Sequence, residues 1–301
     1  MSNEFEYIVD NNKIVITKSP KVFTEDVLDE ILRLEGKFLY KLDTIVLCEG
    51  IEVIDNCAFR GQIICKNIEL PRGLKKINDY AFARCEELER IVLPDSVEEI
   101  GEYAFSGCKK LKSIKLSNKL LNMKGFIFER CSMLEEIEIP KNIKVISAGS
   151  FKGCRNLKKV SLPESLERVE MFCFDGCENL GEISLPDSVN FIGKFAFFHC
   201  LKLEKVEIPS MVKTVEIATF SHCYRLKEVK LANGVEYIRK EAFLNCNVLE
   251  NIEFPKNLKE IGSRAFYNCS LLEKVEIPSS VISIESFSFS NCCLLEEVVF
   301  G

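Results

Sequence analysis

The sequence lacks a long hydrophobic run, an excess of basic residues and an N-terminal targeting signal. Polar residues interrupt every apolar stretch, which excludes the run of about 20 apolar residues that a membrane-spanning helix needs. The net charge of −6 argues against nucleic acid or an anionic membrane surface as a partner, because both attract clustered Lys and Arg. We therefore expect neither membrane insertion nor nucleic-acid binding.

The first residues, Met1 to Glu6, are polar and acidic, with neither the basic nor the apolar region of a secretory signal. We expect a cytoplasmic protein. The alternative is a cell-surface or secreted protein whose leader has been removed.

The motifs of common enzyme classes are also missing. The sequence contains no glycine-rich phosphate loop, no His-Glu-x-x-His and no Gly-x-Ser-x-Gly. Adjacent acids such as Glu86 and Glu87 recur as charged faces of a repeat, so they carry little catalytic information. We predict a protein that is not an enzyme and that binds no cofactor.

What the sequence does have is a strict repeat, in which phenylalanine recurs every 23 residues. The series is Phe59, Phe82, Phe105, Phe128, Phe151, Phe174, Phe197, Phe220, Phe243, Phe266 and Phe289. A fixed period over most of a chain predicts a stack of similar units.

Each repeat contains one short strand pattern. In the copy that follows Cys85, the segment Ile91-Val92-Leu93 alternates between inward and outward positions and ends at Pro94. The first inward position is Ile or Val in every copy, which is typical of parallel strands paired into one sheet. A single repeat buries too little to fold alone, so stability must come from the contacts between neighbours.

Ten of the fifteen cysteines follow the same period, from Cys85 to Cys292. Stacking places equivalent residues about 5 Å apart with parallel side chains, which is poor geometry for a disulfide. We expect free thiols that pack in the core, as a reducing compartment allows.

The repeat, with its I-x-L-P, V-x-x-I and A-F-x-x-C segments, closely resembles the BspA-like (treponemal-type) leucine-rich repeats. The resemblance implies an α/β-type solenoid, a right-handed superhelix with one short parallel strand per repeat on its concave face. Irregular or short helical segments would form the convex side. The resemblance covers residues 42–301, about 11 repeats. Family members are often surface proteins or adhesins that bind other proteins.

The two ends of the repeat array differ. Residues 1–41 lack the repeat, and we expect them to form an N-terminal cap with a strand at 13–17 and a helix at about 25–35. At the other end, the apolar strand Val298, Val299 and Phe300 has no later repeat to cover it. An uncovered strand edge favours self-association, so we expect a homodimer through this end.

The two histidines, His199 and His222, lie 23 residues apart, and each precedes a cysteine. Their composition is close to that of a zinc ligand set. The simpler interpretation is conformational, because the same position in many other repeats holds Gly or Asn, which tolerate a positive φ. We therefore predict no metal site.

Outward strand positions provide the first candidate partner-binding surface. One such column contains Arg90, Lys159, Glu182 and Lys205. The sign of the charge alternates from Glu136 to Glu228, so neighbouring side chains can form ion pairs along the ladder. The column is either a solvated face that keeps the sheet soluble or a binding surface.

Aromatic residues two positions before the core Phe provide the second candidate surface. They are Tyr80, Tyr103, Phe126, Phe172, Phe195 and Phe287, with Phe198 beside them and Glu241 and Arg264 as interruptions. Since charged residues are allowed here, we expect at least partial exposure. These rings form either a partner site or an extension of the core.

The leading functional hypothesis is a non-catalytic scaffold that presents an extended solenoid surface to a protein or peptide partner. The alternatives are an adhesin-type surface or effector protein that binds host proteins, and a structural homo-oligomer formed through the C-terminal repeat.

Overall fold

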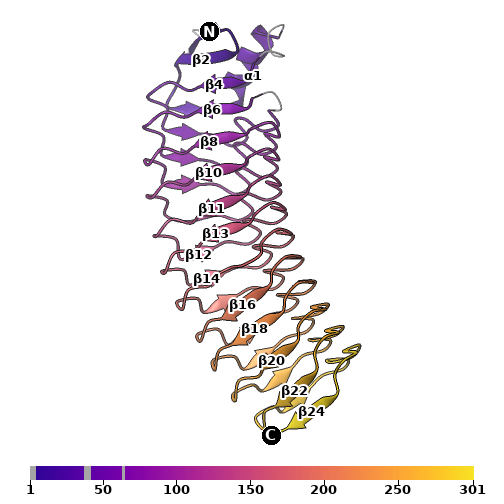
Figure 1. Cartoon of the computed structure of the whole chain (residues 1–301). Coiled ribbons are helices and arrows are strands. Elements are labelled where there is room, and N and C mark those ends of the chain that lie inside the picture. The colour runs from indigo at the N-terminus through magenta and orange to yellow at the C-terminus, as the bar shows by residue number, and fades with distance from the viewer. Residues whose placement is uncertain (1–4, 37–41, 63–64) are drawn as a thin grey trace. The chain divides into compact units, whose positions relative to one another are not determined.

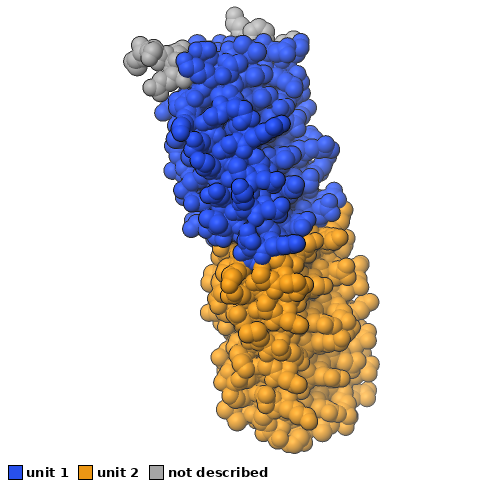
Figure 2. Space-filling model, turned by 90° about the vertical axis from the view of Figure 1, so that its left-hand side faces the viewer, with its two compact units in different colours: residues 1–143 blue, residues 144–301 orange. Residues whose placement is uncertain are grey.

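The computed structural model describes residues 5–36, 42–62 and 65–301. The polar start at residues 1–4 and the end of the expected cap at 37–41 lie outside the described residues. The chain divides into two compact units, residues 1–143 and 144–301, coloured separately in Figure 2. This division falls within the repeats and leaves the predicted cap boundary at residue 41 untested.

Unit 1 begins with a hairpin and a helix. Strands β1 (Glu6–Asp10) and β2 (Lys13–Lys18) pair antiparallel, and β3 (Val22–Phe23) leads into helix α1 (Glu25–Leu34). The helix and β2 occupy the stretches where the sequence predicts a helix and a strand. Leu28 and Ile31 form the buried face of α1, as their helical spacing requires.

The repeats of unit 1 contribute two rows of parallel strands. In the longer row, β2 is followed by β4 (Thr44–Val46), β6 (Asn67–Glu69), β8 (Arg90–Val92), β10 (Ser113–Lys115) and β11 (Glu136–Glu138). The second row consists of two-residue strands, in the order β3, β5 (Val53–Ile54), β7 (Lys76–Ile77) and β9 (Glu99–Ile100). Figure 1 shows both rows along successive turns of the chain.

Unit 2 repeats this arrangement. Its longer row includes β13 (Lys159–Ser161) and the sheet β16 (Lys205–Ile208), β18 (Glu228–Leu231), β20 (Asn251–Glu253), β22 (Lys274–Ile277) and β24 (Glu297–Phe300). The two-residue strands form two sheets, β12 (Val145–Ile146), β14 (Arg168–Val169) and β15 (Phe191–Ile192), and β17 (Thr214–Val215), β19 (Tyr237–Ile238), β21 (Glu260–Ile261) and β23 (Ser283–Ile284).

The periodic phenylalanines form the core. All are fully buried except Phe289, which is partly exposed. Within each unit, neighbouring rings stack with centroids 5.0–5.6 Å apart. Phe23 extends the stack of unit 1, with its ring centroid 5.2 Å from that of Phe59. The predicted parallel solenoid with one unit every 23 residues is confirmed, and the row of two-residue strands is an addition that the sequence did not predict.

Candidate interaction surfaces

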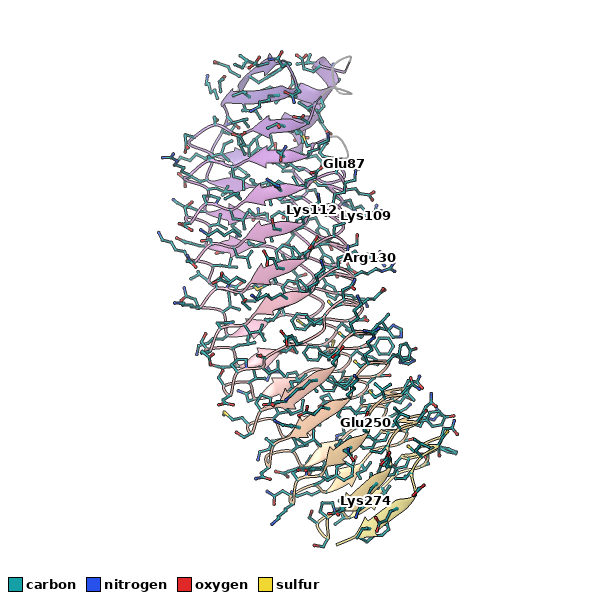
Figure 3. The ribbon with its side chains drawn as sticks, in the orientation of Figure 1. Glu87, Lys109, Lys112, Arg130, Glu250 and Lys274 are labelled. Carbon is teal, nitrogen blue, oxygen red and sulfur yellow. The ribbon has the colours of Figure 1, made fainter. Side chains whose placement is uncertain are left out.

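Ion pairs join neighbouring strands on the outward face of unit 2. Lys205 lies 3.1 Å from Glu228 on β18, and Lys230 lies 2.8 Å from Glu207 on β16. Lys274, labelled beside β22 in Figure 3, lies 3.1 Å from Glu297. Of the alternating series from Glu136 to Glu228, the pair Lys205 and Glu228 thus forms an ion pair along the ladder. From β16 to β24, this face carries solvated side chains that neutralise one another in pairs.

The outward face of unit 1 contains, on β8, a patch with one apolar and one basic side chain. Val92 is 69% exposed, and Arg90 on the same strand forms no ion pair within the described residues. Both line a shallow hollow of about 560 Å³. Arg90 therefore lies beside a hollow, on the face where the sequence suggested a binding surface.

The longer strand row of unit 2 is interrupted between β13 and β16. Glu182 forms a single parallel bridge with Lys205, and residues 183–185, all described, form no strand. Gly181 precedes this segment, at a position where other repeats have a charged residue such as Glu204. Glycine disfavours an extended strand because it has the largest conformational freedom to lose.

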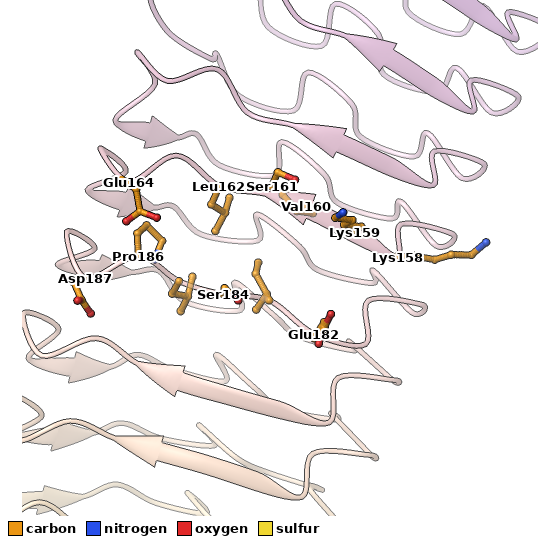
Figure 4. Close-up of a pocket in the computed structure, with 12 residues that line it drawn as sticks. Lys158, Lys159, Val160, Ser161, Leu162, Glu164, Glu182, Ser184, Pro186 and Asp187 are labelled. Atoms are coloured by element: carbon orange, nitrogen blue, oxygen red, sulfur yellow. The ribbon is translucent and has the colours of Figure 1, made fainter.

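A hollow of about 530 Å³ lies over this interruption (Figure 4). Its walls include Ser161 and Ser184, which occupy outward positions where the next two repeats carry Glu207 and Lys230. Two short hydroxyl side chains in succession leave the space that long charged side chains fill elsewhere. The hollow therefore results from the small size of Ser161 and Ser184 as well as from the absence of a strand at residues 183–185.

The floor of the hollow is apolar. Leu162 and Leu185 line it and are partly exposed. The equivalent Leu93 and Ile208 are each 2% exposed. Leu185 also lines an adjoining hollow of about 560 Å³.

Charged residues lie at both ends of this apolar floor. Figure 4 shows Lys159 and Glu182 at the end where β13 begins, and Glu164 and Asp187 at the opposite end. Glu164 and Asp187 are both exposed, and neither forms an ion pair within the described residues. The structure thus brings together two of the predicted outward residues, Lys159 and Glu182, around an apolar floor that sequence reasoning missed.

The aromatic column has an unexpected backbone conformation. Its members Tyr80, Tyr103, Phe126, Phe172, Phe195 and Phe287 all have φ between 55° and 61°. Left-handed conformation costs an ordinary residue about 1–2 kcal/mol. Tyr80 donates its backbone N–H to Glu102 in the next repeat at 2.9 Å, and Phe195 donates to Ile217 at 3.0 Å. The positive φ therefore occurs at residues whose backbone N–H groups form hydrogen bonds to the next repeat.

The aromatic rings stack on one another. The Tyr103 centroid lies 4.9 Å from that of Tyr80 and 4.8 Å from that of Phe126, and Phe172 stacks on Phe195 at 5.1 Å.

Neighbouring side chains cover the outer faces of these stacks. Arg60 lies over Tyr80 and Lys152 lies over Phe172, while Phe198 packs its edge against Phe195. Tyr80 is nevertheless 39% exposed and Phe287 59% exposed, and the other four rings of the column are partly exposed. The column is therefore partly exposed, as the charged residues at this position predict. The role of the rings as partner-binding residues stays a prediction.

The chain's repeats match a family model described as the BspA type leucine rich repeat region, over residues 37–158, 144–271 and 218–301. The chain belongs to the BspA-type leucine-rich repeat family. Proteins with this repeat fold are commonly interaction or surface proteins, and the leucine-rich repeat class is generally a non-enzymatic scaffold.

The chain is similar to solved structures of bacterial leucine-rich repeat proteins, and the two from Faecalibacterium prausnitzii and Eubacterium ventriosum show the same fold. A leucine rich cell surface protein from Faecalibacterium prausnitzii is 21% identical, with 100% of this chain and 94% of that chain covered and a TM-score of 0.58. A leucine-rich repeat protein from Eubacterium ventriosum is also 21% identical, with 96% and 93% covered and a TM-score of 0.57. One from Bacteroides ovatus is 25% identical, with 99% and 93% covered and a TM-score of 0.47. No curated protein matches the chain.

The cysteine column of this BspA-type chain does more than fill space. Thiols of the column in both units, among the described residues, donate to the carbonyl oxygen of a core phenylalanine in the preceding repeat, at 3.0–3.3 Å. Cys200, for example, donates to Phe174. Burial raises the pKa of the Cys200 and Cys223 thiols and raises that of Cys292 to about 11, so they remain protonated donors. The interpretation of this column as packing alone missed these hydrogen bonds.

The histidine column has the predicted positive φ, with values of 56° at His199 and 64° at His222. Asn245 donates from Nδ2 to His222 Nε2 at 3.0 Å, which places the imidazole proton on Nδ1, 2.8 Å from Ser221 Oγ. Burial lowers the pKa of His222, and His199 lowers it further. No cluster of three metal-ligating side chains occurs within the described residues.

The last repeat of the described chain exposes apolar side chains on several sides. Val298 is 43% exposed, Val299 36% and Phe300 70%. Ile282 is 85% exposed, in a column whose other members in unit 2 are Lys, Glu or Asn. Across the described residues, no helix has the length and apolar character needed to cross a membrane.

Proposed function

We propose that this chain is a non-catalytic scaffold for protein–protein interaction, and that it binds a protein or peptide partner through the outward strand face of unit 2. The observation that carries the proposal is the hollow over residues 183–185, where Leu162 and Leu185 are partly exposed. An apolar floor within a polar rim is the usual arrangement at the centre of a protein interface.

The other predicted residues support the proposal unequally. Lys159 and Glu182 line the hollow directly, whereas Lys205 is already engaged with Glu228. Arg90 belongs to the separate hollow of unit 1. Arg60 and Lys152 partly cover the aromatic column, so we assign it a secondary role.

Affinity capture from native lysate, followed by mass spectrometry, tests this function. Ser184→Gln fills the hollow with a side chain of the length found in neighbouring repeats, and Phe195→Glu places a charge in the aromatic column. We expect the wild type and Phe195→Glu to retain the same partner and Ser184→Gln to lose it. A wild-type chain that retains no partner contradicts the scaffold proposal.

We also propose a cytoplasmic location with reduced thiols. The alternative surface or effector role draws support from the name of the Faecalibacterium prausnitzii relative, which is a cell surface protein. Cell fractionation separates the two locations. Recovery only from the cytosol contradicts the surface role, whereas recovery at the cell surface contradicts the cytoplasmic one.

Exposed apolar residues at the last repeat favour a second function, self-association through Val298, Val299 and Phe300. The edge of β24 that does not face β22 has no partner within the described residues. Two copies related by a twofold axis can pair this edge with itself. Light scattering at high protein concentration tests the pairing, and we expect Phe300→Glu to reduce the measured mass to that of a monomer. A wild type that is already monomeric contradicts it.

A further inference from the structure

We infer that the hollow over residues 183–185 binds an extended peptide that carries one apolar side chain followed by a basic residue. This inference rests on the proposed scaffold function and specifies the chemistry of the partner. It combines three features of unit 2: the apolar floor, the short serine walls and the two carboxylates at one end.

The floor and walls determine the central residue. Leu162 and Leu185 offer partly exposed methyl groups, and Ser161 and Ser184 leave room above them. Burying a Leu, Ile or Phe side chain from a partner removes apolar surface of both molecules from water, which is the main favourable contribution at such a contact. A polar side chain at this position would lose its hydration without gaining a partner on the floor.

The charged ends determine the flanking residue. Lys158, Lys159 and Glu182 lie at one end, which therefore carries a net positive charge and disfavours a basic residue of the peptide. Glu164 and Asp187 carry two negative charges at the other end and form no ion pair within the described residues. A Lys or Arg of the peptide therefore meets its complement only beside Glu164 and Asp187.

The backbone of the two turns at the carboxylate end is connected before any partner arrives. The Ser188 Oγ lies 2.7 Å from the Glu164 carbonyl oxygen and 2.6 Å from the Leu166 carbonyl oxygen, and its one proton is donated to one of them at a time. This contact joins the two turns that carry Glu164 and Asp187. A preformed site loses less conformational entropy on binding, which favours a short peptide as occupant.

The repeat supplies a matched control position. Asp95 in unit 1 occupies the repeat position of Asp187 and is also exposed, but the Leu93 that lies before it is only 2% exposed. Asp95→Asn therefore removes an equivalent charge beside a leucine that is buried.

The experiment is selection of a phage-displayed random hexapeptide library on the full chain, after removal of phage that bind the Ser184→Gln variant. We expect the selected peptides to share an apolar residue next to Lys or Arg. In fluorescence anisotropy, a selected peptide should bind the wild type and Asp95→Asn equally. The double variant Glu164→Gln, Asp187→Asn should weaken binding about tenfold, because it removes the complementary charges.

Several outcomes overturn this inference. They are a library that yields no Ser184-dependent peptide, selected peptides that are acidic, and an affinity that the double variant leaves unchanged. Circular dichroism melting of Ser184→Gln and of a second filling variant, Ser161→Gln, shows whether the fold is intact. If the lysate capture still retains a partner that Ser184→Gln does not release, the scaffold function survives and only the peptide assignment fails.

Discussion

Single residues in the left-handed backbone region connect one repeat to the next. Two positions per repeat have a positive φ, one held by Gly, Arg, His or Asn and the other by mostly aromatic residues. His222 belongs to the first position, where Asn268 donates to Asn245 and Asn245 donates to His222. These side chains form a short ladder of hydrogen bonds on the surface of unit 2.

The ladder makes stability depend on pH through His222. Because its folded-state pKa lies below the ordinary value of 6.5, the unfolded chain takes up a proton first as the pH falls. Stability therefore decreases as the pH falls from 6.5 through the folded-state pKa. His199 and Tyr224 contact the ring, and Glu241 opposes the shift.

Urea denaturation between pH 7.5 and 5 measures this dependence. We expect His222→Asn to flatten it, because asparagine keeps the positive φ without titrating. An unchanged pH profile in the variant contradicts the assignment to His222.

The thiols allow a second test at the residue scale. We expect a thiol reagent to label the exposed Cys293 rapidly in the folded protein, because the thiols of the core column from Cys85 to Cys269 are buried. After denaturation without reductant, all fifteen cysteines should react. A smaller number indicates disulfides and contradicts the prediction of free thiols.

At the scale of elements, the sequence predicted the longer strands but missed the two-residue strands and the conformation of the turns. The period located the buried phenylalanines and the longer strands because each depends on a repeated apolar residue. The two-residue strands were missed because segments such as Val53–Ile54 are too short to show alternation. The left-handed conformation of Tyr103 was missed because aromatic residues rarely adopt it.

The same reasoning explains why the hollow was not predicted. Its serines and Gly181 resemble ordinary variation at outward positions when the sequence is read alone. They create a hollow only because residues from neighbouring repeats lie next to one another in the folded chain. The surrounding Lys159 and Glu182 were predicted as outward residues, but their relation to an exposed apolar floor was not.

Substitution of Tyr103 tests the turn as an element. Tyr103→Ala and Tyr103→Gly both remove the ring stacked between Tyr80 and Phe126. Glycine adopts a positive φ without strain, so we expect the Gly variant to be more stable than the Ala variant by about 1 kcal/mol. Urea denaturation measures the difference, and an Ala variant that is the more stable of the two contradicts this account of the turn.

At the scale of the whole molecule, stability arises from contacts between neighbouring repeats. Phe197 stacks on Phe174 and Phe220 and is fully buried. We expect Phe197→Ala to reduce the free energy of unfolding by about 3–5 kcal/mol, because the cavity removes contacts with both neighbours. We also expect a second transition in urea, since repeat stacks lose cooperativity when one interface is weakened. A single transition with an unchanged slope argues against this behaviour.

The central claim for the whole molecule is that a BspA-type solenoid binds its partner at one interruption of its strand row. Site-specific photo-crosslinking tests this most directly, with benzoylphenylalanine placed at Ser184 or, as the matched outward position of unit 1, at Val92. In native lysate we predict a discrete crosslinked adduct from position 184 and none from position 92. No adduct at 184, or equal adducts at both positions, would contradict the account.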